Sequence, residues 1–189
     1  MKKLAIIIVA AFLTTATVKA QHVFEKGDVG INAVLGFAGA DGFIPSIEVS
    51  GEIGVIPTGD IGLVSFGGKV GYKYSKSTFS TFGFGFIDES YTYNQFDFGG
   101  RAAWHLQFFE SDKWDAFAGV GAGLNYRTGA TYTSTYFGQT YTSKEDGGAY
   151  FYAAVFVGGR MMISDSFGLY GEVGYSRLSA VRIGLTFKL

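Results

Sequence analysis

Apolar and polar residues alternate along most of this chain, from about residue 28 to the C-terminus. In "RIGLTFKL" at 182–189, the residues Ile183, Leu185, Phe187 and Leu189 are apolar, and those between them are polar or small. Such alternation predicts a β-strand with one apolar face, because successive side chains of a strand point to opposite sides. Period 2 dominates this part of the chain, and no segment of it has a convincing helical stripe of apolar residues.

Eight segments carry the alternating pattern, and turn-forming residues separate several of them. The predicted strands are 28–37, 45–56, 61–74, 94–108, 114–127, 149–163, 167–176 and 180–189. The connections 57–60, 109–113 and 164–166 are short and rich in turn formers, whereas 75–93 and 128–148 are long and rich in Ser, Thr, Tyr and Gly. In an up-and-down arrangement both termini and the tight turns fall at one end, and both long connections fall at the other.

The faces of the strands distinguish a soluble sandwich from a membrane barrel. Apolar faces run the whole length of the strands, while the opposite faces carry charges in mid-strand, as Glu48 and Arg101 do. In a transmembrane barrel the apolar side chains face lipid and the polar ones line the interior. Strands of about 10–14 residues tilted by ~40° span roughly 25–35 Å, the thickness of a bilayer's apolar core.

Aromatic residues gather at the two ends of the apolar faces. Towards the tight turns these are Phe108, Trp114, Phe167 and Phe187; towards the long connections they are Phe37, Tyr72, Tyr74, Phe96, Tyr126, Phe151 and Tyr175. Two aromatic belts separated by aliphatic residues are typical of the two lipid–water interfaces. The sequence therefore predicts an all-β fold, an eight-stranded antiparallel up-and-down transmembrane β-barrel.

The inward charges are expected to form a structural network, because an unpaired charge in a narrow lumen is costly. Its predicted members are Glu48, Lys69, Lys73, Arg101, Arg127, Arg160, Glu172 and Arg182. A symmetric turn at 57–60 places Glu48 opposite Lys69, and a turn centred on Arg177 places Glu172 opposite Arg182, with Arg160 diagonally beside Glu172. Large inward side chains next to inward glycines predict a filled lumen.

The first twenty residues resemble a signal peptide. Lys2 and Lys3 precede an apolar core at 4–13, and Val18-Lys19-Ala20 supplies small residues for cleavage, so 21–189 is expected to be the mature barrel domain. The chain has no Cys, which excludes a disulfide framework. A net charge of −1 and 29 Gly with 17% aromatic residues favour compact β-structure and give no sign of nucleic-acid binding.

Candidate chemistry is sparse. The two histidines are His22, in the expected frayed N-terminus, and His105, within "WHLQ" (104–107) on the inward face of its strand. Asp115 is a neighbour of His105 that interior pairing explains as well as catalysis does. We expect no catalytic residues, no metal site and no cofactor, and interpret His105 as part of the polar lumen.

The long connections offer more. Residues 81–96 and 131–143 continue to alternate beyond the expected bilayer span, with Tyr and Thr that suit strands. Two interpretations stand side by side: plain extracellular loops, or a protruding sheet whose free edge binds a partner by strand addition.

The whole mature chain resembles the OmpA/OmpX-like eight-stranded outer-membrane β-barrels of Gram-negative bacteria. The last octet is similar to their assembly signal, with Arg182, Gly184, Phe187 and Leu189 in the matching places, although many members end in Phe or Trp. The Gln directly after Ala20, at the expected cleavage site, resembles the start of exported proteins of Bacteroidota. The resemblance implies the outer membrane as location, and outer-membrane lipid and the barrel assembly machinery as partners of a monomer.

The expected function is a structural or surface-adhesive role through the long extracellular loops 75–93 and 128–148, with an extracellular ligand at these loops. A narrow porin-like channel for small solutes is the alternative. A lipid-modifying outer-membrane enzyme is a more distant one, because the His-x-Ser pair that a lipid A deacylase needs is missing from the segment around His105.

Overall fold

The computed structural model describes residues 22–39, 43–83, 85–107, 111–136 and 138–189, with the side chains of 79–88 and 136 left aside. The expected signal peptide, residues 1–20, lies outside the described residues. Among the described residues, no helix is long and apolar enough to cross a membrane.

The described chain forms ten strands. They are β1 (Val29–Phe37), β2 (Ser46–Pro57), β3 (Gly62–Gly83), β4 (Gly85–Leu106), β5 (Trp114–Arg127), β6 (Ala130–Tyr136), β7 (Gln139–Glu145), β8 (Gly148–Ser164), β9 (Phe167–Tyr175) and β10 (Val181–Lys188), with a short 3₁₀ turn η1 (Gly59–Ile61) before β3. Strands β6 and β7 form an added hairpin between β5 and β8.

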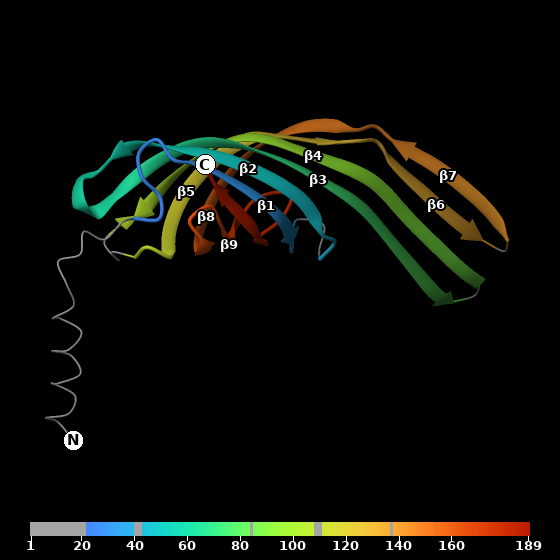
Figure 1. The fold of residues 1–189 in the computed structure, drawn as a ribbon. Helices are drawn as coiled ribbons and strands as arrows, with labels where there is room; N and C mark the ends of the chain where they lie inside the picture. Colours follow the sequence, from blue (N-terminus) through green and yellow to red (C-terminus); the bar gives the residue numbers. More distant parts are fainter. Residues whose placement is uncertain (1–21, 40–42, 84, 108–110, 137) are drawn as a thin grey trace, which may run out of the picture.

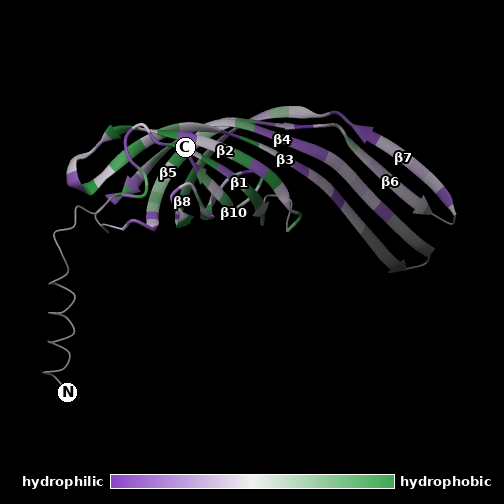
Figure 2. Ribbon diagram, in the orientation of Figure 1, coloured by the Kyte–Doolittle hydropathy of each residue, from purple (hydrophilic) through white to green (hydrophobic). Residues whose placement is uncertain are grey.

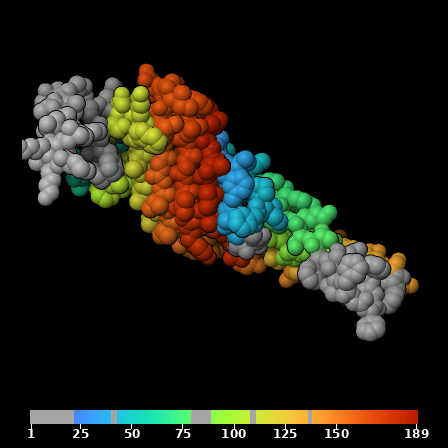
Figure 3. Space-filling view, turned by 90° about the horizontal axis from the view of Figure 1, so that it is seen from below, coloured from blue at the N-terminus to red at the C-terminus, as the bar shows by residue number. Residues whose placement is uncertain are grey.

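The other eight strands close into a barrel by antiparallel pairing of each strand with the next. Strand β10 pairs with β1, and Val29 and Leu189 exchange backbone hydrogen bonds of 3.2 and 2.9 Å. In Figure 3 red β10 lies directly against blue β1. The predicted eight-stranded up-and-down barrel is confirmed.

The barrel is inside out compared with a water-soluble domain. Along β10, Ile183 and Leu185 are exposed, whereas Arg182 and Thr186 are buried. The same alternation holds along β1, β2 and β9, and Figure 2 shows apolar and polar residues alternating along the barrel strands. Since a soluble monomer rarely exposes large contiguous apolar surfaces, this exterior is that of a transmembrane β-barrel.

Strands β3 and β4 continue well beyond the barrel wall. The last β2–β3 pair is Ser46 with Lys73, but β3 and β4 stay paired as far as Gly83 and Gly85. Residues 87–92 of β4 also pair with β6, which in turn pairs with β7. The outer parts of β3 and β4, together with β6 and β7, form a four-stranded sheet, here called the arm, that projects from one end of the barrel (Figure 1).

One predicted strand register is wrong. Glu48 lies opposite Gly71, and Lys69 lies opposite Ser50, two residues away from the predicted pairing. The cause is the turn, which is longer than the assumed symmetric turn at 57–60: Pro57 pairs with Leu63 across it, and η1 lies within it. The irregularity between Gly54 and Ile56 changes the register by one residue only. Between β9 and β10 the register places Arg182 opposite Glu172.

Two short segments fold into the ends of the barrel. At the tight-turn end, residues 22–28 enter the mouth: Phe24 is only 1% exposed, and Gly27 donates a backbone hydrogen bond of 2.9 Å to Gly54. The expectation of a frayed N-terminus is therefore wrong for this segment. At the arm end, residues 176–180 turn inward, with Leu178 and Ser179 fully buried.

Candidate functional site

An outer charge cluster occupies the half of the lumen nearer the arm. Its members are Glu48, Lys69, Asp97, Arg101, Glu172 and Arg182. Arg182 bridges the two glutamates: its Nε lies 3.1 Å from Glu48 and its Nη1 donates to Glu172. Lys69 binds Glu48 at 3.0 Å, and Arg101 binds Glu172 at 2.8 Å.

The segment 176–180 is attached to this outer cluster. Arg182 donates to the Ser176 hydroxyl and, at 3.0 Å, to the Ser179 carbonyl, while the Ser179 hydroxyl donates to Glu48. The buried Lys73 ammonium lies 3.4 Å from the carbonyl of Leu178. The charges that line the lumen therefore also hold segment 176–180 in the arm end of the barrel.

An inner charge cluster lies nearer the tight turns and contains Arg160, Glu52, Asp115, His105 and Ser65. Arg160 Nε lies 2.9 Å from Asp115, and Arg160 Nη2 donates to Glu52. Arg160 lies diagonally beside Glu172 in the register of β8 and β9, as predicted, but its ion pairs are with Glu52 and Asp115. Opposite charges thus surround Arg160 on two sides.

The ion-pair partners of Glu172 are Arg101 and Arg182. The network also contains Glu52, Asp97 and Asp115, which were not among its predicted members. Each stands at an inward alternate position of its strand, so the signal for them was present. Arg127, a predicted lumen residue, lies at the arm-side rim and is partly exposed.

The inner cluster contains a Ser–His–Asp arrangement. His105 Nδ1 lies 2.9 Å from Asp115, and Nε2 lies 2.9 Å from the Ser65 hydroxyl. Ser65, however, donates its proton to Glu52 at 3.0 Å, so His105 is not positioned to accept it. Ser65 and His105 are fully buried, and the cavity beside Asp115 measures about 10 Å³, which leaves no room for a substrate. The arrangement is a polar network.

Aromatic side chains fill the lumen between the two clusters. Phe117 lies 5.6 Å from Tyr170 and 6.3 Å from Phe156, measured between ring centroids. Arg101 lies over the ring of Phe156 at 4.2 Å. A cavity lined by Lys69, Arg101 and Glu172 among others measures about 20 Å³, enough for about one water molecule. This part of the lumen has no passage for a solute.

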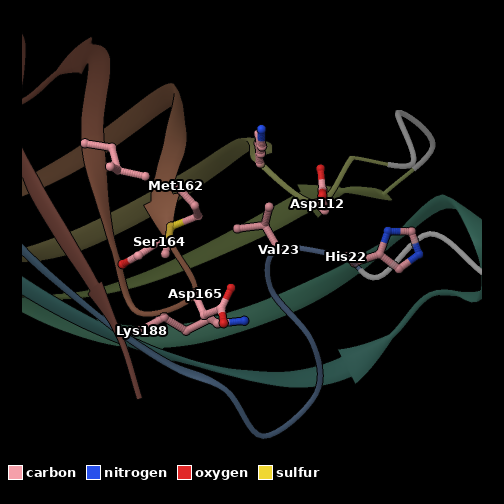
Figure 4. Close-up of a pocket in the computed structure, with 9 residues that line it drawn as sticks. His22, Val23, Asp112, Met162, Ser164, Asp165 and Lys188 are labelled. Carbon is pink, nitrogen blue, oxygen red and sulfur yellow. The ribbon is translucent and has the colours of Figure 1, made fainter.

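A larger cavity of about 340 Å³ lies at the tight-turn end, between segment 22–28 and two turns (Figure 4). Met162 is its buried floor, and His22 and Val23 form one side. Its charged lining is two acidic and two basic residues, namely Asp112, Asp165, Lys113 and Lys188. Mixed charge gives no net attraction for a ligand of one sign. Among the described residues, no group of His, Cys, Asp or Glu could hold a metal ion.

A cluster of tyrosines fixes the base of the arm to the barrel rim. Arg127 donates to the Tyr91 hydroxyl at 3.0 Å and to Glu145 at 3.2 Å, and the Tyr132 hydroxyl donates to Glu145 at 3.0 Å. The rings of Tyr91 and Tyr132 lie 4.7 Å apart. Local desolvation and the hydrogen bond to Glu145 raise the pKa of Tyr132 to about 12. The arm therefore continues the barrel wall with side-chain support of its own.

The outermost strand of the arm, β7, has pairing on one side. It pairs with β6 from Gln139 to Glu145, and all seven residues are exposed. The sheet order ends at β7, so its other side carries backbone groups that no described strand pairs. An open edge of this kind is a ready template for another strand.

Comparisons with known proteins give only a distant likeness. A scan of protein-family models gives no match, and a search of curated proteins gives none either. Among solved structures, the chain is similar to Ail, the attachment invasion locus protein of Yersinia pestis, at 14% identity and a TM-score of 0.42, over 87% of this chain and 100% of that one. A second structure of Ail, in complex with the heparin analogue sucrose octasulfate, matches with the same values.

Proposed function

We propose that this protein is an outer-membrane surface protein whose barrel serves as a sealed scaffold and whose arm makes adhesive contacts outside the cell. The observation that supports this most is the open edge of β7 on a four-stranded sheet that projects from the barrel. The composition of the arm, rich in Tyr, Thr and Ser, offers hydrogen bonds and aromatic surface to a protein partner.

Location in the outer membrane is supported by the signal-like N-terminus and by the last strand. Gly184, in the assembly-signal position, lies where a Cβ would be 2.1 Å from the Ala33 carbonyl, so only glycine fits. Phe187 and Leu189 face outward, and Arg182 belongs to the outer charge cluster. Recognition of this strand by the barrel assembly machinery would place the chain in the outer membrane.

The alternatives find less support. A passive channel needs an open lumen, but the aromatic layer around Phe117 and the segments 22–28 and 176–180 fill it. A lipid-modifying enzyme needs a reactive group that lipid can reach, whereas Ser65 and His105 are buried inside. We therefore propose that the protein has no catalytic activity and no cofactor.

The test is deletion of residues 131–143 in the full chain displayed on bacterial cells. Retention of the cells on immobilised extracellular-matrix proteins and on host-cell monolayers should fall to the level of cells without the protein. The change in gel migration on heating, which reports a folded barrel, should persist. Lys113→Ala, at the opposite end of the barrel, is the control and should leave retention unchanged. Equal retention with and without 131–143 would overturn the proposal.

A further inference from the structure

The backbone groups of β7 face its open side at alternate residues. The Thr128 N–H donates to the Asn94 carbonyl at 2.9 Å, so the even-numbered residues of β4 direct their backbone groups towards β5 and β6. The registers Thr92 with Thr131 and Thr131 with Lys144 carry this alternation outward. It follows that Thr140, Thr142 and Lys144 direct their N–H and C=O groups away from β6, towards the open edge.

These three residues match a second copy of themselves. With two antiparallel β7 strands centred on Thr142, Thr140 of one copy faces Lys144 of the other, and Tyr141 faces Ser143. Gln139 then faces Glu145, so no like charges meet along the seven residues. In this register all three residues whose backbone groups face the open edge are paired on each strand, which gives about six backbone hydrogen bonds.

The strand lacks most devices that keep edges apart. It contains no Pro, its register with β6 has no irregularity, and Lys144 is its single basic residue. The centred register brings no like charges together and pairs every open-edge residue of both strands, so a second copy of this chain fits this edge.

Antiparallel pairing also sets the direction of the second molecule. Strands β3 and β4 run without interruption from barrel to arm, so the arm points away from the barrel (Figure 1). When two β7 strands pair antiparallel, the two arms point towards each other and the two barrels lie at opposite ends. We infer that β7 pairs with β7 of a second copy in a facing membrane and so joins two cells of the same kind. This inference rests on the proposed adhesive function of the arm.

Disulfide trapping tests the pairing directly, because the chain has no Cys of its own. Tyr141 and Ser143 form a pair without mutual hydrogen bonds, whose Cα atoms lie about 4.5 Å apart, within disulfide range. One vesicle population carries full-length Tyr141→Cys and a second, differently tagged, carries Ser143→Cys. After mixing and mild oxidation, we expect a disulfide-linked pair that contains both tags, together with increased light scattering. Either variant alone should give little cross-link.

Proline substitutions supply matched controls. Thr142→Pro, added to both cysteine variants, removes an N–H that faces the open edge, so cross-linking and scattering should be lost while β6 and β7 stay paired. Ser143→Pro removes an N–H that faces β6 and should detach the hairpin as well, seen as faster protease cleavage of the arm. Cleavage of Thr142→Pro at the parent's rate shows that its hairpin is intact.

Three results would overturn the inference. Cross-links that form only when both variants share one vesicle would contradict the facing arrangement. Absence of cross-links and scattering, while retention on matrix proteins still depends on 131–143, would refute self-pairing and leave the proposed function standing. If the full chain shows neither retention on matrix proteins nor cross-links, both the inference and the proposed function are refuted.

Discussion

Glu172 holds the outer charge cluster together, and its removal should be costly. The carboxylate, 2% exposed, accepts from Arg182, from Arg101 at 2.8 Å and from the Tyr170 hydroxyl at 2.5 Å. Glu172→Ala leaves Arg101 without its ion-pair partner and leaves Arg182 with Glu48 alone. Removing one member of a buried ion pair costs about 3–5 kcal/mol, so we expect a loss of that size in the free energy of unfolding.

Glu145 provides the matched control on the same molecule. It pairs with Arg127 at 3.2 Å but is 54% exposed, and an exposed pair is worth about 1 kcal/mol at most. Glu145→Ala should therefore cost about 2–4 kcal/mol less than Glu172→Ala. Glu172→Gln, which keeps the shape and one acceptor, should fall between the two and serves if Glu172→Ala does not fold.

The assay is urea unfolding in lipid vesicles, followed by the fluorescence of Trp104 and Trp114 and by gel migration with and without heating. Equal m-values would show that the variants unfold from the same state, so that midpoints report stability. If Glu172→Ala unfolds within about 1 kcal/mol of the parent, the bridge between Glu48 and Glu172 through Arg182 does not stabilise the barrel as argued.

Three further predictions concern the wall, the inner mouth and the arm. Gly123→Ala should destabilise the barrel, because its Cβ would lie 2.1 Å from the Phe98 carbonyl, whereas Gly171→Ala, with nothing within 4 Å, should leave the unfolding midpoint unchanged. Phe24→Ala removes a ring that lies 4.6 Å from His105 and 4.7 Å from Arg160; it should cost about 3 kcal/mol and speed amide exchange at Gly27, with His22→Ala as the unaffected control. The pKa of Tyr132 is raised to about 12, so its support of the hairpin is complete below pH 10 and is lost as pH rises through about 12. In the parent, protease cleavage of the arm should accelerate over that pH range, and Tyr132→Phe should remove this pH dependence. A cleavage rate that does not change with pH in the parent would contradict the prediction.

The alternation of side chains made the barrel predictable from sequence. Because a strand that separates lipid from a filled lumen must alternate, the faces of Arg182 and Ile183 follow from their positions alone. Short connections also make registers predictable. A turn centred on Arg177 gives the β9–β10 register, with Arg182 opposite Glu172. The predicted lengths of the strands in the wall agree with the structure to within a few residues, except where β3 and β4 extend into the arm.

Other contacts lie beyond local pattern. Pro57 pairs with Leu63 across a turn that includes η1, so Glu48 lies two residues away from the partner that a symmetric turn at 57–60 predicts. The register of neighbouring strands correctly places Arg160 diagonally beside Glu172, but Arg160 pairs across the lumen with Glu52, 108 residues away in sequence, which this register does not reveal. Residues 22–28 do not alternate, and their burial depends on the space left in the mouth of the barrel.

The hairpin β6–β7 shows why the sequence left two interpretations open, plain extracellular loops and a protruding sheet. Thr and Tyr at 131–143 favour strands, but the same residues suit extracellular loops. The decisive contacts are long-range: at the rim Arg127 donates to Tyr91 and to Glu145, and Tyr132 donates to Glu145. The alternating sequence pattern alone does not predict these side-chain contacts.

We propose that the barrel is a sealed scaffold and that the arm carries the function. Single-channel recording in planar bilayers tests it most directly, with the full mature chain reconstituted as a folded barrel. The filled layer around Phe117 and the covers at 22–28 and 176–180 predict a flat baseline without steady discrete openings. Steady openings of uniform size would contradict the account, because they require a lumen that these residues do not fill.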